Sequence, residues 1–139
     1  MDSIISLLTP KKATFYLDEN STIRQALEKF DYHKFTVVPL LDEQGRYCGT
    51  LSEGDILRFI KNVANFNIKI LERTNVKDIE RHRQYKGLKI DADIKEVFDL
   101  SLSQNFIPIM DDKGTYIGIV TRKEVIKSLS DKNNEFPKL

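Results

Sequence analysis

Two short motifs in this sequence contain residue types that can bind a polar ligand. Each places a hydroxyl residue three positions before a carboxylate: Ser52 before Asp55, and Thr121 before Glu124. At a helix start this spacing is a capping box, which satisfies unpaired backbone N–H groups and needs no ligand. The same helix start favours phosphate, and an ionised carboxylate can accept hydrogen bonds from both hydroxyls of a ribose. The motifs therefore indicate either a structural cap or a nucleotide-binding helix start.

Both motifs belong to a segment that occurs twice. The stretch 47–57 recurs at 116–126, with a constant offset of 69 residues that also relates Ser52 to Thr121. The offset continues upstream, where it pairs Pro39 with Pro108, Asp42 with Asp111 and Gly45 with Gly114. A repeat of this length indicates that one supersecondary unit was duplicated and that the copies pack together. In each copy a glycine, Gly49 or Gly118, precedes the motif, and we expect it to let a ligand approach the backbone.

The hydrophobic pattern predicts the same order of elements in both copies. For the first copy we expect a helix within 1–8, a strand over 11–17, a helix with Ser21 or Asn20 as N-cap, strands over 35–41 and 46–51, and a helix over 53–62. For the second copy we expect a strand over 88–90, a helix around 94–98, strands over 106–110 and 115–120, and a helix over 122–129. The connector 63–75 is apolar enough to pack against the fold.

The predicted fold class is mixed α/β, with tandem repeats related by a pseudo-two-fold axis and each repeat built as β-α-β-β-α. Neither copy has enough strands to bury both faces of its sheet, so the two copies should dock. We place an N-terminal helix and the first repeat in residues 1–68, the second repeat in 69–130, and a flexible tail in 131–139.

Composition narrows the function classes. The 139 residues carry a net charge of +1, so no global electrostatic field points to nucleic acid. The apolar runs are too short to span a membrane, and the N-terminus lacks the basic region of a secretory signal. Cys48 is the only cysteine. It cannot form an intrachain disulfide, which fits a cytoplasmic location, and we expect a small buried side chain rather than a nucleophile.

Catalytic and metal-binding patterns are missing from the sequence. His33 and His82 are too few and too far apart for a metal site, and no cluster of Cys, His and carboxylates has ligand spacing. The sequence also lacks a nucleophile–base pair, a phosphate-binding Walker loop and a glycine-rich dinucleotide turn. We therefore expect neither an enzyme nor a cofactor, and we assign no catalytic residue.

The duplicated residues resemble a known family. Val37–Leu40, followed by Asp42, Gly45 and Gly49–Asp55, resembles the signature of a cystathionine β-synthase (CBS) domain. Ile107–Ile109 with Gly118–Glu124 resembles the second member of a pair, and the resemblance covers about residues 8–129. It implies a free-standing CBS pair, or Bateman module. Such a module is a non-catalytic regulatory sensor that binds an adenine nucleotide between its repeats and signals to a partner protein.

The resemblance also implies two nucleotide pockets. Pocket one would take Lys11, Ala13, Thr14, Phe35, Thr36, Val38, Thr121, Arg122, Lys123 and Glu124, with the last four on ribose and phosphate. Pocket two would take Tyr85, Lys86, Asn105 and Ile107, with Ser52 and Asp55 on the ribose. The sequence departs from the family pattern at Glu124, where Asp is usual, and at Glu53, where a basic residue is expected.

Lys11, Arg122 and Lys123 make pocket one the more basic of the two, unless they form an ordinary solvated cluster. The run Thr121–Lys123, the start Lys11-x-Ala13 and the shorter loop of the second repeat are similar to free-standing CBS pairs of Gram-positive bacteria that are receptors for cyclic di-AMP. Cyclic di-AMP is therefore the favoured ligand. The alternatives are an AMP, ADP or ATP energy sensor that uses Ser52 and Asp55, and a ligand-free dimerisation or interaction module.

The resemblance to half of a larger disc implies a homodimer with an isologous helix interface. Phe59, Ile60, Val125 and Leu129 on the C-terminal helices of the repeats are the candidate surface. Resemblance to the cyclic di-AMP subgroup suggests a metabolic or stringent-response enzyme as the regulated partner. The basic loop 80–86 is a lip of pocket two, a partner-docking face or a plain solvated loop.

Overall fold

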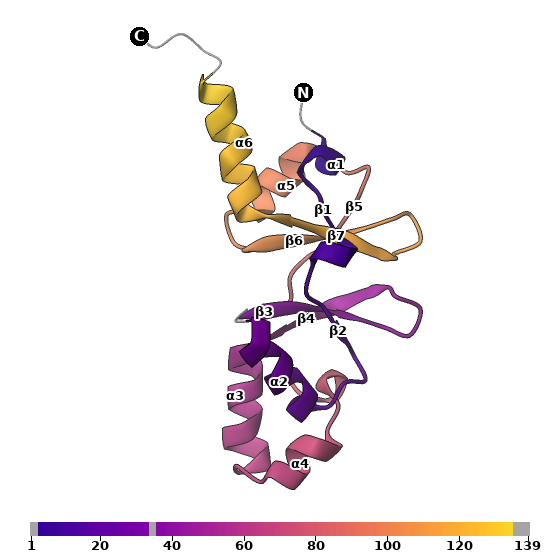
Figure 1. The fold of residues 1–139 in the computed structure, drawn as a ribbon, viewed down its shortest axis with the longest axis vertical. Helices are drawn as coiled ribbons and strands as arrows, with labels where there is room; N and C mark the ends of the chain where they lie inside the picture. The colour runs from indigo at the N-terminus through magenta and orange to yellow at the C-terminus, as the bar shows by residue number, and fades with distance from the viewer. Residues whose placement is uncertain (1–2, 34–35, 135–139) are drawn as a thin grey trace. The chain divides into compact units, whose positions relative to one another are not determined.

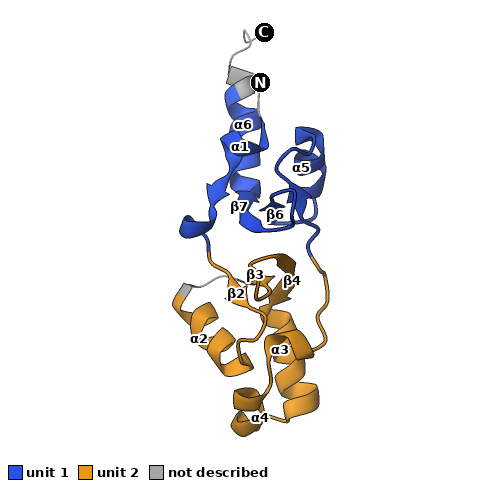
Figure 2. Cartoon of the chain, turned by 90° about the vertical axis from the view of Figure 1, so that its right-hand side faces the viewer, with its two compact units in different colours: residues 1–14, 85–139 blue, residues 15–84 orange. Residues whose placement is uncertain are grey.

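The computed structural model describes residues 3–33 and 36–134, which divide into two compact units (Figure 2). Unit 1 comprises residues 1–14 and 85–139, and unit 2 comprises residues 15–84. Each unit contains one β-α-β-β-α repeat, which confirms the mixed α/β class. The N-terminal segment thus belongs to the unit of the second repeat. The division of the chain at 68/69 and 130/131 stays a prediction, because compact packing and repeat limits are different properties.

Unit 2 begins with β2 (Leu17–Asp18) and continues through α2 (Ile23–His33), β3 (Val37–Leu41), β4 (Tyr47–Ser52) and α3 (Glu53–Phe59). A π-helical turn η2 (Ile60–Ala64) extends α3, and α4 (Ile68–Arg73) and the 3-10 helix η3 (Val76–Asp78) complete the unit. The sheet order is β2-β3-β4, with β2 parallel and β4 antiparallel to β3. Helices α2 and α3 lie on one face of this sheet (Figure 1) and bury the core between them and the strands.

Unit 1 begins with α1 (Ile4–Leu7), β1 (Thr9–Pro10) and the 3-10 helix η1 (Lys11–Ala13). After unit 2 the chain returns to form β5 (Leu88–Lys89), α5 (Ile94–Leu100), β6 (Phe106–Met110), β7 (Tyr116–Thr121) and α6 (Arg122–Asn134). The sheet order is β1-β7-β6-β5, and α5 and α6 cover one face of it (Figure 1). Ile4 and Leu7 of the N-terminal helix are part of this core.

The two hairpins share the same turn, in which one aspartate carboxylate accepts two backbone N–H groups. In the first, Asp42 Oδ1 accepts hydrogen bonds from the N–H groups of Gln44 and Arg46, at 2.9 Å each. The carboxylate of Asp111 accepts the two corresponding bonds in the second hairpin, also at 2.9 Å. The backbone N–H of Arg46 is the largest cause that lowers the pKa of Asp42 below its ordinary value. A turn held by one carboxylate explains why an acid and a glycine recur at the same spacing.

The strand predicted over residues 11–17 is wrong. Both the N–H and the hydroxyl of Thr14 donate to the Lys11 carbonyl, at 3.0 and 2.8 Å, and close a 3-10 turn. Only Leu17 and Asp18 are paired as a strand, with β3. A 3-10 turn over residues 11–13 thus stands where the apolar pattern suggested an extended strand.

Helix limits also differ from the predictions at the start of α2 and at the end of α6. Thr22, rather than Ser21 or Asn20, caps α2: the Gln25 N–H donates to its Oγ1 at 3.1 Å, and the Thr22 N–H donates to Gln25 Oε1 at 2.8 Å. Ser21 instead gives its carbonyl to the N–H of Val76 at 2.8 Å, a tertiary contact that sequence does not reveal. Helix α6 runs to Asn134, so 131–134 of the predicted tail are helical, and 135–139 lie outside the described residues.

The connector between the repeats packs only in part. Leu71 of α4 is buried, and Ile70 packs against the core of unit 2. Phe66 and Ile68 are exposed. Phe66 follows Asn65 through a turn in which both residues have positive φ, at +61° and +48°. The prediction that the apolar connector packs is therefore correct for Ile70 and Leu71 and wrong for Phe66 and Ile68.

The short strand β1 covers the free edge of β7. Thr9 pairs with Ile119 and Pro10 with Gly118. Gly118 has φ +153°, and a Cβ atom at this position would overlap the Thr9 carbonyl oxygen. A backbone atom cannot move aside as a flexible side chain can. The glycine is therefore needed so that the N-terminal segment can approach the sheet.

We predict that Gly118→Ala destabilises the protein by about 3 kcal/mol or more, because it combines overpacking with a strained φ. Gly45→Ala is the matched control: it has φ +78° but open space around the added Cβ. The control should lose only about 1–2 kcal/mol. Free energies of unfolding from urea titrations measure both values, and equal losses would contradict the close approach of β1.

Candidate functional site

The first motif forms a complete capping box at the start of α3. The N–H of Asp55 donates to Ser52 Oγ at 3.1 Å, and the N–H of Ser52 donates to Asp55 Oδ2 at 2.9 Å. Asp55 is buried, and its side chain is 0% exposed. Its second oxygen, Oδ1, accepts from Arg58 Nη2 at 2.6 Å and from the backbone N–H of His82 at 2.8 Å. The carboxylate assigned to pocket two is thus enclosed by donors of its own unit.

The second motif has a different environment at the start of α6. The N–H of Glu124 donates to Thr121 Oγ1 at 3.1 Å, as in the first copy. Arg122 is held at two points: its N–H donates to the Asn105 carbonyl at 2.9 Å, and its Nε donates to the Ser101 carbonyl at 2.7 Å. Lys123 is exposed. The junction therefore presents a fixed guanidinium and an ammonium group beside a half-buried carboxylate.

The N-terminal residues of pocket one lie beside the strand that leads to this junction. Pro10 is paired with Gly118, and Thr14 Oγ1 accepts a hydrogen bond from the Tyr116 hydroxyl at 2.8 Å. Lys11 lies between these two anchor points. Thr121 lies three residues further along β7 than Gly118, which is about 10 Å of strand. Within unit 1, Lys11 therefore lies beside the start of β7, and the Thr121 junction lies at the end of the same strand.

Four residues of pocket two also gather in unit 1. The Tyr85 ring packs edge-on against Phe106 with centroids 4.9 Å apart, and its hydroxyl accepts from the Asn105 N–H at 3.3 Å. The backbone of Lys86 is fixed by the buried side chain of Gln104, which accepts its N–H at 2.8 Å and donates to its carbonyl at 3.1 Å. Sequence reasoning missed Gln104, whose two-sided amide contact has no sequence signature.

The predicted residues of the two pockets divide between the units. Unit 1 contains Lys11, Ala13, Thr14, Tyr85, Lys86, Asn105, Ile107, Thr121, Arg122, Lys123 and Glu124, and unit 2 contains Thr36, Val38, Ser52 and Asp55. Phe35 lies outside the described residues. Val38 and Ile107, which are equivalent under the repeat offset, are fully buried in the cores of their units. A ligand could therefore contact these two positions only through their backbone.

The glycines before the motifs have a different role from the one predicted. We expected Gly49 and Gly118 to let a ligand reach the backbone. A Cβ on Gly49 would overlap Oε1 of Gln84, and a Cβ on Gly118 would overlap the Thr9 carbonyl. Segments of the protein itself fill the space that each glycine leaves.

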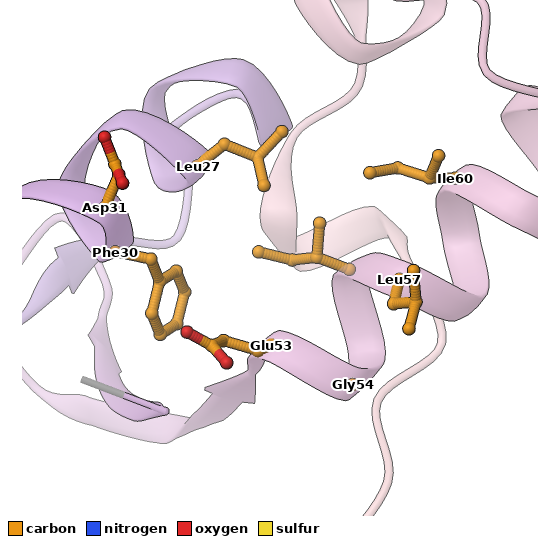
Figure 3. A pocket seen from close by; sticks show the side chains of 8 residues that line it. Leu27, Phe30, Asp31, Glu53, Gly54, Leu57 and Ile60 are labelled. Atoms are coloured by element: carbon orange, nitrogen blue, oxygen red, sulfur yellow. The ribbon is translucent and has the colours of Figure 1, made fainter. Parts of the chain in front are cut away.

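A groove lies between α2 and the helix formed by α3 and η2. It has a volume of about 510 Å³. Figure 3 shows that Leu27 and Phe30 line one wall and Leu57 and Ile60 the other, with the carboxylate residues Asp31 and Glu53 also at the groove. Apolar walls and two acids do not suit a phosphate. The groove suits an apolar partner surface, and the sequence did not reveal it.

The predicted dimer surface needs correction at two positions. Phe59 and Val125 are buried in the cores of their own units, so they cannot form an interface. The exposed apolar residues on these helices are Leu57, at 62%, and Ile126, at 59%, which the 69-residue offset makes equivalent. Leu129 is also exposed, as predicted. A strand-to-helix junction sets which helix face is turned inward, and helical periodicity alone left this choice open.

Cys48 is half-buried on β4. Its thiol donates to the Leu40 carbonyl at 3.2 Å and to Glu19 Oε2 at 3.4 Å. Burial, followed by the contact with Glu19, raises the pKa of the thiol from its ordinary value of 9.0 to about 12. The side chain is less buried than we predicted. With so high a pKa it is a poor nucleophile at neutral pH.

A family model named CBS domain matches residues 6–62 and 76–131, one match for each repeat. The chain belongs to the CBS domain family. CBS pairs are generally regulatory modules. The match agrees with the duplicated β-α-β-β-α units and with the signature residues from which the resemblance was drawn.

Comparison with individual proteins supports the same fold. An uncharacterised 17.7 kDa protein of Acidianus ambivalens is 27% identical over 120 residues, which cover 84% of this chain and 68% of that protein. Across the curated relatives that it matches, the CBS pair spans between 13% and 87% of their own length. A CBS pair of this kind thus occurs in proteins of about its size and within much longer ones.

Two similar crystal structures contain nucleotides. The CbpB protein of Listeria monocytogenes in complex with cyclic di-AMP has a TM-score of 0.83 and 18% identity, and the alignment covers 97% of this chain and 100% of that chain. CBSX2 of Arabidopsis thaliana in complex with AMP has a TM-score of 0.73 and 21% identity, with 94% and 98% coverage. At these identities the similarity shows the fold.

Two further findings limit the chemistry of the described residues. Within 3–33 and 36–134, no three His, Cys, Asp or Glu side chains lie together as a metal site would require. In the same part of the chain, no helix combines the length and the apolar character needed to cross a membrane.

We predict that Cys48 reacts with a thiol reagent at pH 8 at least about 100-fold more slowly in the native protein than in urea. The folded-state pKa lies above the unfolded value, so folding favours the protonated thiol. This contribution to stability is fully present below pH 9 and is lost as the pH rises towards 12. Glu19→Gln should raise the native rate only modestly, because burial is the larger cause. Similar rates in the native and urea-unfolded states would contradict the prediction.

Proposed function

We propose that this CBS pair is a non-catalytic regulatory sensor that binds an adenine nucleotide, with cyclic di-AMP as the favoured ligand. The observation that carries the proposal is the cationic junction of unit 1. Lys11 lies beside β7, and Arg122 and Lys123 follow directly after it. Cyclic di-AMP contains two phosphodiester groups. Arg122 and Lys123 at the end of β7 suit such a ligand better than a neutral one, and Lys11, beside the start of that strand, adds a third cation to the same unit.

The geometry of Arg122 supports a role in phosphate binding. Its Nε is engaged by the Ser101 carbonyl at 2.7 Å, which holds the guanidinium plane in one orientation. The remaining N–H donors of the guanidinium are then preorganised for a phosphate, so less side-chain entropy is lost on binding. Thr121 and Glu124 would face the ribose. The pocket-one residues Ala13, Thr14, Phe35 and Thr36, with the backbone at Val38, would contact the adenine.

Nucleotide binding would act on a partner protein by linkage. If the ligand favours one arrangement of the two repeats, it changes the affinity of any partner that distinguishes these arrangements, and the coupling is reciprocal. The proposed partner is a metabolic or stringent-response enzyme in the cytoplasm. The AMP complex of CBSX2 makes an AMP, ADP or ATP sensor the second candidate, in which Ser52 and Asp55 would hold the ribose.

We further propose a homodimer formed through the exposed helix faces of the repeats. Leu57 on α3 and Ile126 on α6 occupy equivalent positions and are both more than half exposed. The apolar groove beside Leu57 continues this surface in unit 2. Equivalent apolar positions on two duplicated helices suit an isologous interface, in which the same patch is used by both chains.

We predict that Lys123→Ala weakens cyclic di-AMP binding about tenfold, or ~1.4 kcal/mol, because it removes an exposed cation without changing the fold. Lys127→Ala is the control, since Lys127 is an exposed lysine one turn further along α6. Isothermal titration calorimetry measures both dissociation constants. Equal losses in the two variants would indicate nonspecific attraction rather than a site. A thermal-shift panel with AMP, ADP, ATP, cyclic di-GMP and S-adenosylmethionine then ranks the competing ligands.

We predict that Leu57→Glu combined with Ile126→Glu converts the dimer to a monomer, because each change places a charge in the apolar interface. Leu102→Glu is the control: Leu102 is 85% exposed but lies outside these helices. Sedimentation velocity gives the mass of each variant. A double variant that stays dimeric would exclude this interface, and a monomeric wild-type protein would exclude the dimer.

A further inference from the structure

We infer that the two duplicated junctions have diverged in role. Asp55 is a structural latch that fixes residues 81–84 to unit 2, and nucleotide binding falls to the Thr121–Glu124 junction alone, with one nucleotide per chain. The ligand half of this inference rests on the proposed function. The latch half rests only on contacts within unit 2.

Asp55 already accepts three hydrogen bonds. Its Oδ2 accepts from the N–H of Ser52 at 2.9 Å, and its Oδ1 accepts from Arg58 at 2.6 Å and from the His82 N–H at 2.8 Å. Because the side chain has no exposed surface, a ribose hydroxyl could reach this carboxylate only by displacing a group already packed against it, such as the His82 N–H, which would then lose its partner inside the protein. Asp55 is therefore poorly suited to the ribose contact that the family resemblance assigns to it.

A second contact fixes the same segment two residues later. The side-chain amide of Gln84 accepts from the Thr50 N–H at 2.9 Å and donates to the Thr50 carbonyl at 3.1 Å, so it continues the ladder at the edge of β4. Between the two anchors, Arg83 has φ +52°, a conformation that non-glycine residues seldom adopt. This segment is therefore fixed at two points, His82 and Gln84. Residues 81–84 are a strap that is fixed to unit 2.

The second junction lacks these features. Glu124 is half-buried, and among the described residues of unit 1 no hydrogen bond to its carboxylate is present. The position equivalent to Arg58 is Lys127, which is exposed and forms no ion pair with Glu124 in that part of the chain. The strand β1 covers Gly118 through its backbone and leaves the Glu124 carboxylate unengaged. The carboxylate of the second motif is thus available where that of the first is not.

Hydrogen exchange combined with calorimetry tests both halves. In Asp55→Asn, we expect the amides of residues 80–86 to exchange at least about tenfold faster and the melting temperature to fall. The stoichiometry should remain one cyclic di-AMP per chain, with a dissociation constant within about twofold of wild type. In Glu124→Gln, exchange over 80–86 should stay unchanged while cyclic di-AMP binding weakens about tenfold. Glu53→Gln, an exposed acid in the same turn as Asp55, is the control that should change neither.

Arg58→Gln provides the second latch variant if Asp55→Asn does not fold, because Arg58 is 46% exposed and its loss leaves the capping box intact. It should accelerate exchange over 80–86 in the same direction. Two nucleotides bound per wild-type chain, or loss of binding in Asp55→Asn with unchanged exchange, would overturn the inference and leave the proposed function in place. If no adenine nucleotide binds the wild type, the proposed function and the ligand half both fail, and the exchange rates still decide the latch.

Discussion

The structure depends on covering one sheet edge in each unit. The outer strand of each hairpin, β4 or β7, has backbone N–H and carbonyl groups on its free side that need partners. In unit 1 the strand β1 supplies them as backbone, and in unit 2 the Gln84 amide supplies them as a side chain. The strand β1, which covers the second repeat, comes shortly before β2 of the first repeat, and Gln84, which covers the first repeat, comes shortly before β5 of the second. This exchange explains why residues 1–14 belong to the compact unit of the second repeat.

Edge covering also explains the glycines. Gly49 and Gly118 occur at the same place in both repeats, and at both positions a side chain would overlap the covering segment. A glycine before a helix start is often associated with close approach of a ligand. Here the close approach is made by the protein itself. The recurrence of the glycines therefore indicates duplication. The role of each glycine depends on which atoms fill the space beside it.

The two repeats kept their backbone bonds and changed their side chains. The hairpin carboxylates and the hydroxyl caps are retained in both copies with almost identical distances. The first junction directs its carboxylate inward to Arg58 and to the His82 N–H, whereas the carboxylate of the second junction is half-buried and follows Arg122 and Lys123 in sequence. Duplication supplies two equivalent scaffolds, and a few substitutions let one stabilise the fold while the other remains open to a ligand. The same logic applies to the helices, where equivalent positions on α3 and α6 remain apolar and exposed.

By itself the sequence determined the duplication, the mixed α/β class, the order of elements and the limits of the hairpin strands to within about two residues. These follow from local signals, since acidic turns, glycines and alternating apolar residues act over a few positions. Only the tertiary structure decided that residues 11–13 form a turn, that Phe59 and Val125 face the core, and that Asp55 is enclosed. Thr14 closes the turn at residues 11–13 locally and also accepts a hydrogen bond from the distant Tyr116, and Asp55 is enclosed by the distant His82 N–H. Local periodicity carries no information about which distant donor will meet a given carboxylate, because that meeting is set by how the elements pack.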